Sequence, residues 1–339
     1  MSTSKTMRAA VHTGPLQFEI REFPLPEPHD GWALVRVAHC GICGSEKHNL
    51  NREPTRDDHI CGHELSGIIA KAPAGSGLSE GDIVIVHPAA SCGACVSCTQ
   101  GGWAHCENRP SVAHGPTSAF AEYIVAPPHL IREKPDGMDF STAAMAEPVA
   151  VGLHAAKKME EPGGNAVVFG AGGIGLLGAQ CLKARGAGRV FLADVKESSL
   201  RAAREIGDFE TVQSNDDASW GQVKDVPIHF VFDVVGHVPA ITARGLGLLE
   251  RHGTFVVIGG QEEMPVNLMP VLMKELRIQG SGWTTRDDFE EAIALLVDGR
   301  VRVDKMVTAT YPLEQITEAF AASRDHIKVM VDCGGADGS

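Results

Sequence analysis

Short apolar runs separated by glycine and proline dominate the chain as far as about Met145. Runs of this kind, rich in β-branched residues and bounded by turn formers, predict β-strands. The clearest candidates are residues 31–43, 62–72, 81–87 and 119–127. This part of the protein is therefore expected to be β-rich.

After Met145 the pattern changes to apolar strands that alternate with helices. Such alternation predicts an α/β fold with a parallel, doubly wound sheet. The series consists of strands at 165–170, 189–195, 228–236 and 253–260, helices at 174–187, 198–207 and 239–250, and a last run at 274–282. Residues 286–301 and 312–324 are expected to be helical, and residues 327–333 to form a strand.

Composition and charge narrow the class of protein. The 339 residues are 43% hydrophobic with mixed charges, which suits a folded chain of two domains. The net charge is −13 without any run of Lys or Arg, and this disfavours nucleic acid and anionic membranes as partners. The first fifteen residues have no apolar core of signal-peptide length, and the uncharged runs 83–106 and 162–182 do not resemble bilayer spans. We expect a cytoplasmic protein.

Four of the nine cysteines lie within fifteen residues, as Cys92, Cys95, Cys98 and Cys106. In a reducing compartment clustered cysteines are more often metal ligands than disulfides. Four thiolates form a closed tetrahedral zinc site, so the spacing predicts structural zinc. A reactive or disulfide-bonded loop is the alternative.

A glycine-rich turn follows the first strand of the α/β part. Gly170, Gly172 and Gly175 have the GxGxxG spacing between a predicted strand and a predicted helix. In a dinucleotide site the first glycine makes the turn, the second admits the pyrophosphate and the third permits close helix packing. The helix N-terminus adds N–H groups and partial positive charge. A purely structural strand–turn–helix is the alternative.

Asp194 lies 24 positions after Gly170, at the end of the second predicted strand. There its carboxylate can accept hydrogen bonds from the ribose hydroxyls of NAD. A 2′-phosphate about 4 Å away would be repelled by about 4 kcal/mol per unit charge at an effective dielectric near 20. We expect NAD to be favoured over NADP, with Lys196 and Arg201 softening the preference.

A second group of metal-binding residue types lies in the β-rich part. Thiolate, imidazole and carboxylate suit a zinc site with an open position. The candidates are Cys40, Cys43, His48, Cys61, His63 and Glu64. Spacing alone does not show that they converge, and Cys40 and Cys61 also read as small buried hydrophobic residues.

In this order the motifs resemble a known family, the zinc-containing medium-chain dehydrogenases, and in particular their polyol and threonine dehydrogenase branch. The resemblance covers nearly the whole chain through "GICGSEKH", "GHELSG", "CGACVSCTQGGWAHC", "AEPVAVGLHA" and "GAGGIG". It implies a β-rich GroES-like catalytic domain with a structural zinc lobe at about 91–107, and a Rossmann NAD-binding domain. The expected limits are 1–148 for the catalytic domain, 149–282 for the NAD-binding domain, and 283–339 for the return to the catalytic domain.

The resemblance also implies roles for single residues. Cys43 and His63 look like ligands of a catalytic zinc, and Glu64 like a ligand or a group that exchanges with water. Glu147 looks like the carboxylate ligand of the polyol branch, with an ordinary Glu at a helix start as the alternative. The four-cysteine loop corresponds to the structural zinc, which implies two zinc ions per chain.

Two further residues look like a proton relay. Ser45 corresponds to the hydroxyl that takes the substrate proton and His48 to the later relay histidine. Glu46 stands where the family usually has Asp, and Ser199 where it often has Lys or Arg, so support around the zinc and the grip on the ribose could differ. The cofactor contacts implied by the resemblance are Gly170, Gly172, Gly173, Ile174, Gly175, Asp194, Lys196, Val235, Ile258 and Gly260.

The implied activity is a zinc-dependent NAD(H) oxidoreductase that interconverts a secondary alcohol and its ketone, in a homodimer or homotetramer. Polyols, sugars, cyclitols and amino alcohols are the candidate substrates, with L-threonine or a specialised metabolite as rivals. Candidate substrate contacts are Arg52, Arg56, Asp57, Asp58, His114 and Trp283, although the first four also read as a solvated loop. A non-catalytic NAD- or zinc-binding sensor and a zinc-free quinone-type reductase are the alternatives from other classes.

Overall fold

The computed structural model describes residues 6–29, 31–110, 114–160, 162–260 and 266–335. The chain divides into two compact units, each described here by itself. Unit 1 contains residues 1–147, 285–293 and 306–339, and unit 2 contains residues 148–284 and 294–305. The domain limits expected from the sequence stay a prediction.

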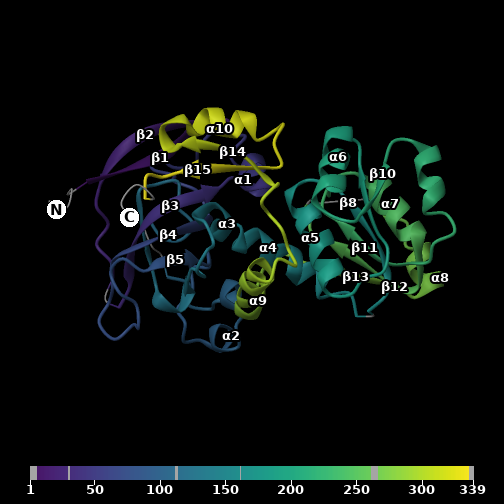
Figure 1. Ribbon diagram of the computed structural model, residues 1–339, viewed down its shortest axis with the longest axis horizontal. Coiled ribbons are helices and arrows are strands. Elements are labelled where there is room, and N and C mark those ends of the chain that lie inside the picture. The colour runs from purple at the N-terminus through teal and green to yellow at the C-terminus, as the bar shows by residue number, and fades with distance from the viewer. Residues whose placement is uncertain (1–5, 30, 111–113, 161, 261–265, 336–339) are drawn as a thin grey trace. The chain divides into compact units, whose positions relative to one another are not determined.

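A mixed sheet forms the centre of unit 1. Its main path through the described residues is β14-β15-β3-β4-β5-β7, and β6 pairs with β3 beside that path. Strands β14 and β15 come from the end of the chain, and Figure 1 shows them in yellow near the purple β3. A separate antiparallel hairpin, β1–β2, precedes the sheet. The strand bounds are β1 Thr6–Gly14, β2 Gln17–Pro24, β3 Ala33–Gly41, β4 Glu64–Lys71, β5 Ile83–Val86, β6 Tyr123–Ala126, β7 Ile131–Glu133, β14 Val307–Pro312 and β15 Lys328–Asp332.

Burial explains why these runs form a sheet. Strand β3 is buried along most of its length and lies inside the sheet, between β15 and β4. Its side chains belong to a core cluster that also contains Phe120 and Phe320. The helices that lie wholly in this unit are short: α1 Gly44–Asn49, α2 Val96–Thr99, α3 Phe140–Ala144 and α10 Ile316–Ala322. Helix α9, Arg286–Val297, is divided between the two units after residue 293. Helix α4, Ala146–Ala156, begins at the junction of the two units.

Unit 2 is built around a parallel sheet. In the described part of the chain its strands follow the order β10-β9-β8-β11-β12-β13, and Figure 1 labels all of them but β9 in the teal to green region. Counted from β8 this is the order 3-2-1-4-5-6 of the doubly wound dinucleotide-binding sheet. The strands are β8 Asn165–Phe169, β9 Val190–Asp194, β10 Glu210–Gln213, β11 Ile228–Asp233, β12 Leu249–Val257 and β13 Arg277–Gly280; the helices are α5 Gly173–Ala184, α6 Glu197–Ile206, α7 Pro239–Leu248 and α8 Met269–Lys274.

The structure confirms the α/β class and the β-rich first part, with local differences. The helix expected over 312–324 is shorter, because Pro312 closes β14 and a 3₁₀ turn precedes Ile316. Strands β1, β2, β7, β10 and β14 were not expected. No helix among the described residues is both long and apolar enough to cross a membrane.

Candidate metal and cofactor sites

The four-cysteine loop closes on itself in unit 1. The sulfur atoms of Cys92, Cys95, Cys98 and Cys106 lie within 4.8 Å of one another. Zn–S bonds of about 2.3 Å in a tetrahedron place sulfurs about 3.8 Å apart, so small shifts would fit the group to one zinc ion. The N–H groups of Ala94 and Cys95 donate to Cys92 Sγ at 3.5 and 3.4 Å. These donors lower the pKa of the Cys92 thiol, which favours the ligating thiolate.

A buried histidine packs beneath this loop. The His87 ring lies 5.0 Å from the rings of both Trp103 and Phe289, and its Nδ1 accepts from Ala89 N at 3.1 Å. The side chain is only 2% exposed. Burial, helped by the charge of Arg132, lowers the pKa of His87 to about 3. The folded protein therefore holds this imidazole neutral.

We expect His87 to make the protein acid-sensitive. Its folded-state pKa lies below the value of about 6.5 in the unfolded chain, so its contribution is complete above pH 6.5 and is lost as the pH falls toward 3. Between pH 7 and 5 this one group should remove about 2 kcal/mol from the free energy of unfolding. Denaturant unfolding of His87→Gln should show a smaller loss over that interval. The same substitution at exposed His105 is the control, and equal pH slopes in wild type and His87→Gln would contradict the assignment.

The second group of candidate ligands converges at one end of the β3–β4 pair. Strand pairing places Gly41 opposite Glu64, so the residues that follow β3 meet the start of β4. Cys43 is the N-cap of helix α1, and His63 comes directly before β4. Ligand atoms of Cys43, His63 and Glu64 lie within 4.8 Å of one another. A thiolate, an imidazole and a carboxylate at this separation fit a zinc ion with a position left open.

Glu46 ties two of these ligands together. Its Oε2 accepts from Cys43 N at 3.0 Å, and its Oε1 accepts from Gly62 N at 2.8 Å and lies 3.1 Å from His63 Nδ1. A carboxylate on one ring nitrogen fixes the orientation of a metal-binding histidine and leaves the other nitrogen for the metal. Burial alone would lower the pKa of His63, but Glu46 and Cys43 outweigh it and raise that pKa well above its usual value. Glu46 and Cys43 thus favour positive charge at this position.

Glu147 lies outside the compact ligand group but interacts with it electrostatically. Burial is the main cause that raises the pKa of Glu147 to about 7, while His63 and Lys328 lower that pKa and Glu64 raises it. Lys328 was not expected from the sequence. Its Nζ donates to both carboxylate oxygens of Glu64, at 2.7 and 2.6 Å, and to Ile42 O at 3.1 Å. A lone lysine in the apolar run "IKVMVDC" was the only sequence signal.

Ser45 and His48 belong to helix α1, next to the ligand group. Ser45 Oγ donates to Cys43 Sγ at 3.2 Å. His48 is exposed and follows three residues later, so the two side chains are neighbours on the helix surface. The structure thus places the predicted relay hydroxyl against a predicted ligand and the predicted relay imidazole near solvent.

In unit 2 the glycine-rich turn has the geometry that its spacing predicts. Gly170 has φ = 98°, a left-handed conformation that favours glycine. A Cβ on Gly175 would lie 1.7 Å from Gly170 O, so helix α5 could not approach β8 with any larger residue there. Asp194 ends β9; its Oδ2 accepts from Ala171 N and its Oδ1 from Lys196 N, each at 2.8 Å. The carboxylate therefore lies directly beside the turn.

The other predicted cofactor contacts lie at the same edge of the sheet. Val235 and Ile258 follow the carboxyl ends of β11 and β12, where ligands of doubly wound sheets bind. Val235 Cγ2 would lie 3.1 Å from a Cβ on Gly170. Gly172 is the N-cap of α5, Gly173 and Ile174 open that helix, Lys196 is the N-cap of α6, and Gly260 follows Ile258.

The loop that follows α1 is open to solvent. Arg56 Nε lies 3.8 Å from Asp58 Oδ1, and both side chains are exposed; Arg52 and Asp57 are exposed too. His114 contacts Phe23 edge-on, with ring centroids 5.3 Å apart. Trp283 is 59% exposed and belongs to unit 2. None of these six candidates belongs to the compact ligand groups found among the described residues.

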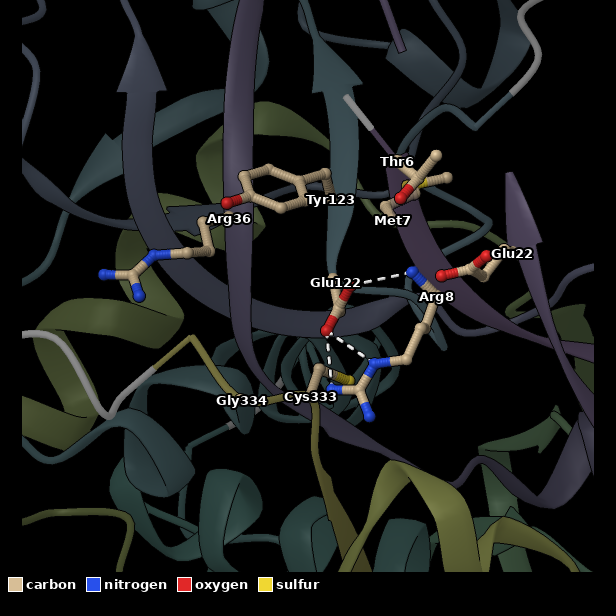
Figure 2. Close-up of a pocket in the computed structure, with 9 residues that line it drawn as sticks. All are labelled: Thr6, Met7, Arg8, Glu22, Arg36, Glu122, Tyr123, Cys333 and Gly334. Atoms are coloured by element: carbon tan, nitrogen blue, oxygen red, sulfur yellow. Dashed lines mark hydrogen bonds and ion pairs between the residues drawn. The ribbon is translucent and has the colours of Figure 1, made fainter. Parts of the chain in front are cut away.

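A pocket of about 330 Å³ on unit 1 contains none of the predicted site residues. Figure 2 shows that its floor is an ion pair: Arg8 bonds Glu122 through Nε at 2.9 Å and Nη2 at 2.6 Å. Arg8 Nη1 also bonds Glu314, which ties β1 to the C-terminal segment. This hollow is part of the scaffold, and the chemistry belongs to the metal and glycine-turn sites.

Comparison with known proteins identifies the family. The family model described as "Alcohol dehydrogenase GroES-like domain" matches residues 29–136. The family model described as "Zinc-binding dehydrogenase" matches residues 173–298. The sorbitol dehydrogenase of Halalkalibacterium halodurans is 32% identical over 341 residues, covering 96% of this chain and 99% of the relative. The chain belongs to the zinc-containing medium-chain dehydrogenases.

Two solved structures of similar proteins agree with this family. One, described as a short chain alcohol dehydrogenase from Escherichia coli CFT073, is in complex with NADH (TM-score 0.86, 25% identity, 97% of this chain and 100% of that one). The other, a zinc-binding dehydrogenase from Sinorhizobium meliloti 1021, is bound to NADP (TM-score 0.86, 27% identity, the same coverage). As a medium-chain dehydrogenase the protein is a zinc-dependent NAD(H) oxidoreductase, which confirms the predicted enzyme class, GroES-like and Rossmann folds and cofactors. The assignments of single residues remain predictions.

Proposed function

We propose that this medium-chain dehydrogenase interconverts a polyol-type secondary alcohol and its ketone at the Cys43–His63–Glu64 group. The carrying observation is the convergence of those three ligand types beside the Ser45 hydroxyl. Similarity to a sorbitol dehydrogenase supports the substrate class. Unit 1 would be the catalytic domain and unit 2 the cofactor domain.

In this proposal Cys43 and His63 hold the catalytic zinc with a carboxylate from Glu64 or Glu147. Zinc held there would supply Lewis-acid polarisation of the substrate oxygen, and NAD bound to unit 2 would supply the hydride acceptor. Glu46 holds His63 and the Cys43 backbone in place, so the ligands are arranged before the metal arrives. The four cysteines of the loop hold a second, structural ion, which gives two per chain.

The protein's own proton path begins at Ser45. Its hydroxyl both donates and accepts hydrogen bonds, so it can take the proton of the alcohol and pass its own onward. His48, on the same helix and exposed, is the group that returns protons to solvent at neutral pH. Unit 2 would thus bind the cofactor that accepts the hydride, and the proton would leave the protein through helix α1 of unit 1.

We further propose that Asp194 makes NAD the preferred cofactor. Similar structures hold NADH and NADP, so similarity alone does not decide between the two. Asp194→Asn removes the negative charge and keeps one oxygen, which can accept from one of the two backbone N–H groups of Ala171 and Lys196. The ratio of kcat/KM for NAD to that for NADP should fall by about 10- to 100-fold, since a 2′-phosphate is no longer repelled.

The matched control for Asp194 is Glu197→Gln. Glu197 opens helix α6 three residues later, and its carboxylate is already paired with Arg204. This variant should keep the wild-type ratio. An unchanged ratio in Asp194→Asn would show that the carboxylate does not face the ribose.

We also propose that the protein forms a homodimer or homotetramer through β13. This strand is the last of the described parallel sheet, and exposed edge strands readily pair with a second copy. Large apolar side chains gather on it and on the neighbouring α8: Leu268, Met269, Leu272, Met273 and Ile278 are 46–70% exposed. A patch of this kind marks an interaction surface. Ile278→Lys should lower the molar mass in sedimentation equilibrium; an unchanged mass would exclude this edge.

The remaining parts of the proposal concern the surroundings of the protein. A net charge of −13 argues against nucleic acid and anionic membranes as partners. A cytoplasmic location is proposed because five predicted ligands are thiols, which a reducing compartment keeps reduced. The substrate is then a small cytoplasmic alcohol or ketone.

The decisive experiment is NADH formation on mixing protein and NAD with a panel of alcohols. The panel contains polyols, sugars, cyclitols, threonine and simple secondary alcohols, each with and without a zinc chelator. Chelator-sensitive turnover of a polyol is expected. Turnover confined to threonine would replace the substrate class, and silence across the panel with a filled zinc site would overturn the proposal.

A further inference from the structure

Lys328 is a buried cation next to the proposed catalytic metal. It opens strand β15 with 6% of its surface exposed, and its partner Glu64 opens β4 with none exposed. An ammonium has three donors. All three are accounted for by Glu64 Oε1, Glu64 Oε2 and Ile42 O, at 2.7, 2.6 and 3.1 Å.

The Glu64 carboxylate therefore faces two cation positions. On one side it accepts from Lys328, and on the other it lies within 4.8 Å of the ligand atoms of Cys43 and His63. A carboxylate has about four lone-pair sites, so it can bind both cations at once. Its hydrogen bonds to the Lys328 ammonium weaken its attraction for a metal ion, and binding of a metal ion would weaken its attraction for Lys328.

We propose that Lys328 is a positioning residue that competes with zinc for the Glu64 carboxylate and so keeps Glu64 a weak, exchangeable ligand. The inference rests on the proposed function of the Cys43–His63–Glu64 group. It adds a role for a residue that touches neither substrate nor cofactor in that proposal. Its consequence is that a coordination position opens without loss of the ion.

The sheet holds this competition in place. Strand β3 pairs with β4 through Gly41 and Glu64 and with β15 through Gly41 and Met330, so the three strands share one register point. A Cβ on Gly41 would lie 2.1 Å from Glu64 Oε2. Glycine at that position therefore leaves the space that the carboxylate occupies beside Lys328.

Electrostatics make the lysine more than a packing element. Lys328 bonds both carboxylate oxygens of Glu64, and Cys43 and Glu147 also interact electrostatically with its ammonium. Without Lys328 the same anionic groups would face the metal alone. Glu64 would then bind zinc more tightly and exchange more slowly.

The test compares metal-free and zinc-loaded protein in Lys328→Met. Losing the ammonium leaves the Glu64 charge buried without its counter-ion, so the metal-free variant should melt about 5–10 °C below wild type. Zinc should restore most of that loss. The zinc-induced rise in Tm should thus exceed the wild-type rise, and zinc affinity against a competing chelator should increase about tenfold or more.

Two further variants separate competition from simple support. Lys328→Met combined with Glu64→Gln removes both charges and should bring the zinc-induced rise in Tm back to the wild-type value or below. Lys47→Met is the matched control, because Lys47 is a half-buried lysine of α1 whose Nζ donates to the Ser323 carbonyl oxygen at 3.1 Å. It should keep the wild-type zinc response. The structural zinc is common to all variants, so it cancels in the comparison.

Each outcome decides the matter. Equal or weaker zinc binding in Lys328→Met, or failure of both its metal-free and zinc-loaded forms to fold, would overturn the proposal. The melting temperatures and zinc affinities are measured without enzyme turnover. A wild-type protein that binds zinc but oxidises no alcohol would therefore contradict the proposed function, and it would leave the proposed competition for Glu64 unaffected.

Discussion

Cys43→Ser is expected to lose turnover by about a thousandfold or more, which corresponds to about 4 kcal/mol in the activation barrier. The substitution replaces the thiolate of the proposed catalytic site with a hydroxyl, which is a poor zinc ligand at neutral pH. The backbone bond from Cys43 N to Glu46 does not depend on the side chain, so the helix α1 should still form. NADH binding, measured by fluorescence titration, should stay within about threefold of wild type.

Cys40→Ala is the matched control for that prediction. Cys40 lies three residues earlier on β3, is fully buried, and its thiol is kept neutral by a pKa raised well above the usual value. Its loss should cost about 1 kcal/mol in stability through a small cavity and leave kcat/KM nearly unchanged. Near-wild-type turnover in Cys43→Ser would remove the zinc role from this residue.

The second large effect is expected in the four-cysteine loop. Cys98→Ser should remove one zinc ion per chain and expose the loop to proteases, because the loop has only a small apolar cluster of its own. Structural zinc contributes about 10–16 kcal/mol of apparent binding free energy in isolated zinc-finger peptides at pH 7, so losing several kcal/mol of stability is reasonable here. Thermal unfolding and metal analysis by mass spectrometry would measure both effects.

Counting zinc across variants separates the two sites. Wild type should hold two ions per chain, Cys43→Ser and Cys98→Ser one each, and the double variant none. Thr99→Ala is the control, because Thr99 shares helix α2 and its hydroxyl donates to the carbonyls of Cys95 and Val96. A Cys98→Ser protein that kept both ions would contradict the structural site.

Local pattern predicted the parts of this protein that are local. The strand–turn–helix around Gly170 was predictable because its glycines are required by contacts with residues close in sequence. A side chain on Gly175, for example, would collide with Gly170 O. The four sulfurs of the loop also come from one short segment. In both cases the residues that contact each other in the structure are also close together in the sequence.

Contacts between distant segments set the limit of prediction. The sequence could not show that Cys43 meets Glu64, because the β3–β4 register brings them together. The resemblance predicted Cys43, His63 and Glu64 jointly, but it left Glu46 as a departure with an unknown effect. The extra methylene of Glu46, compared with Asp, still lets its carboxylate reach Cys43 N, Gly62 N and His63.

Lys328 was missed for the same physical reason. It is separated from Glu64 by 264 positions, and nothing in "IKVMVDC" distinguishes a buried ion-paired lysine from one at the start of an exposed strand. Strand β14 was missed because its alternating pattern of half-buried and exposed residues is short and lies at the sheet edge. Only the pairing with β15 and β3 reveals what these residues contact.

The late position of β15 also has a consequence for the order in which the protein matures on the ribosome. Synthesis at about 5–20 residues per second separates the emergence of Glu64 from that of Lys328 by about 13–50 s. Unit 2 ends at residue 305, so its sheet can be complete while unit 1 still waits for its last two strands. During that interval the Glu64 carboxylate lacks the ammonium of Lys328, with which it is paired in the folded protein.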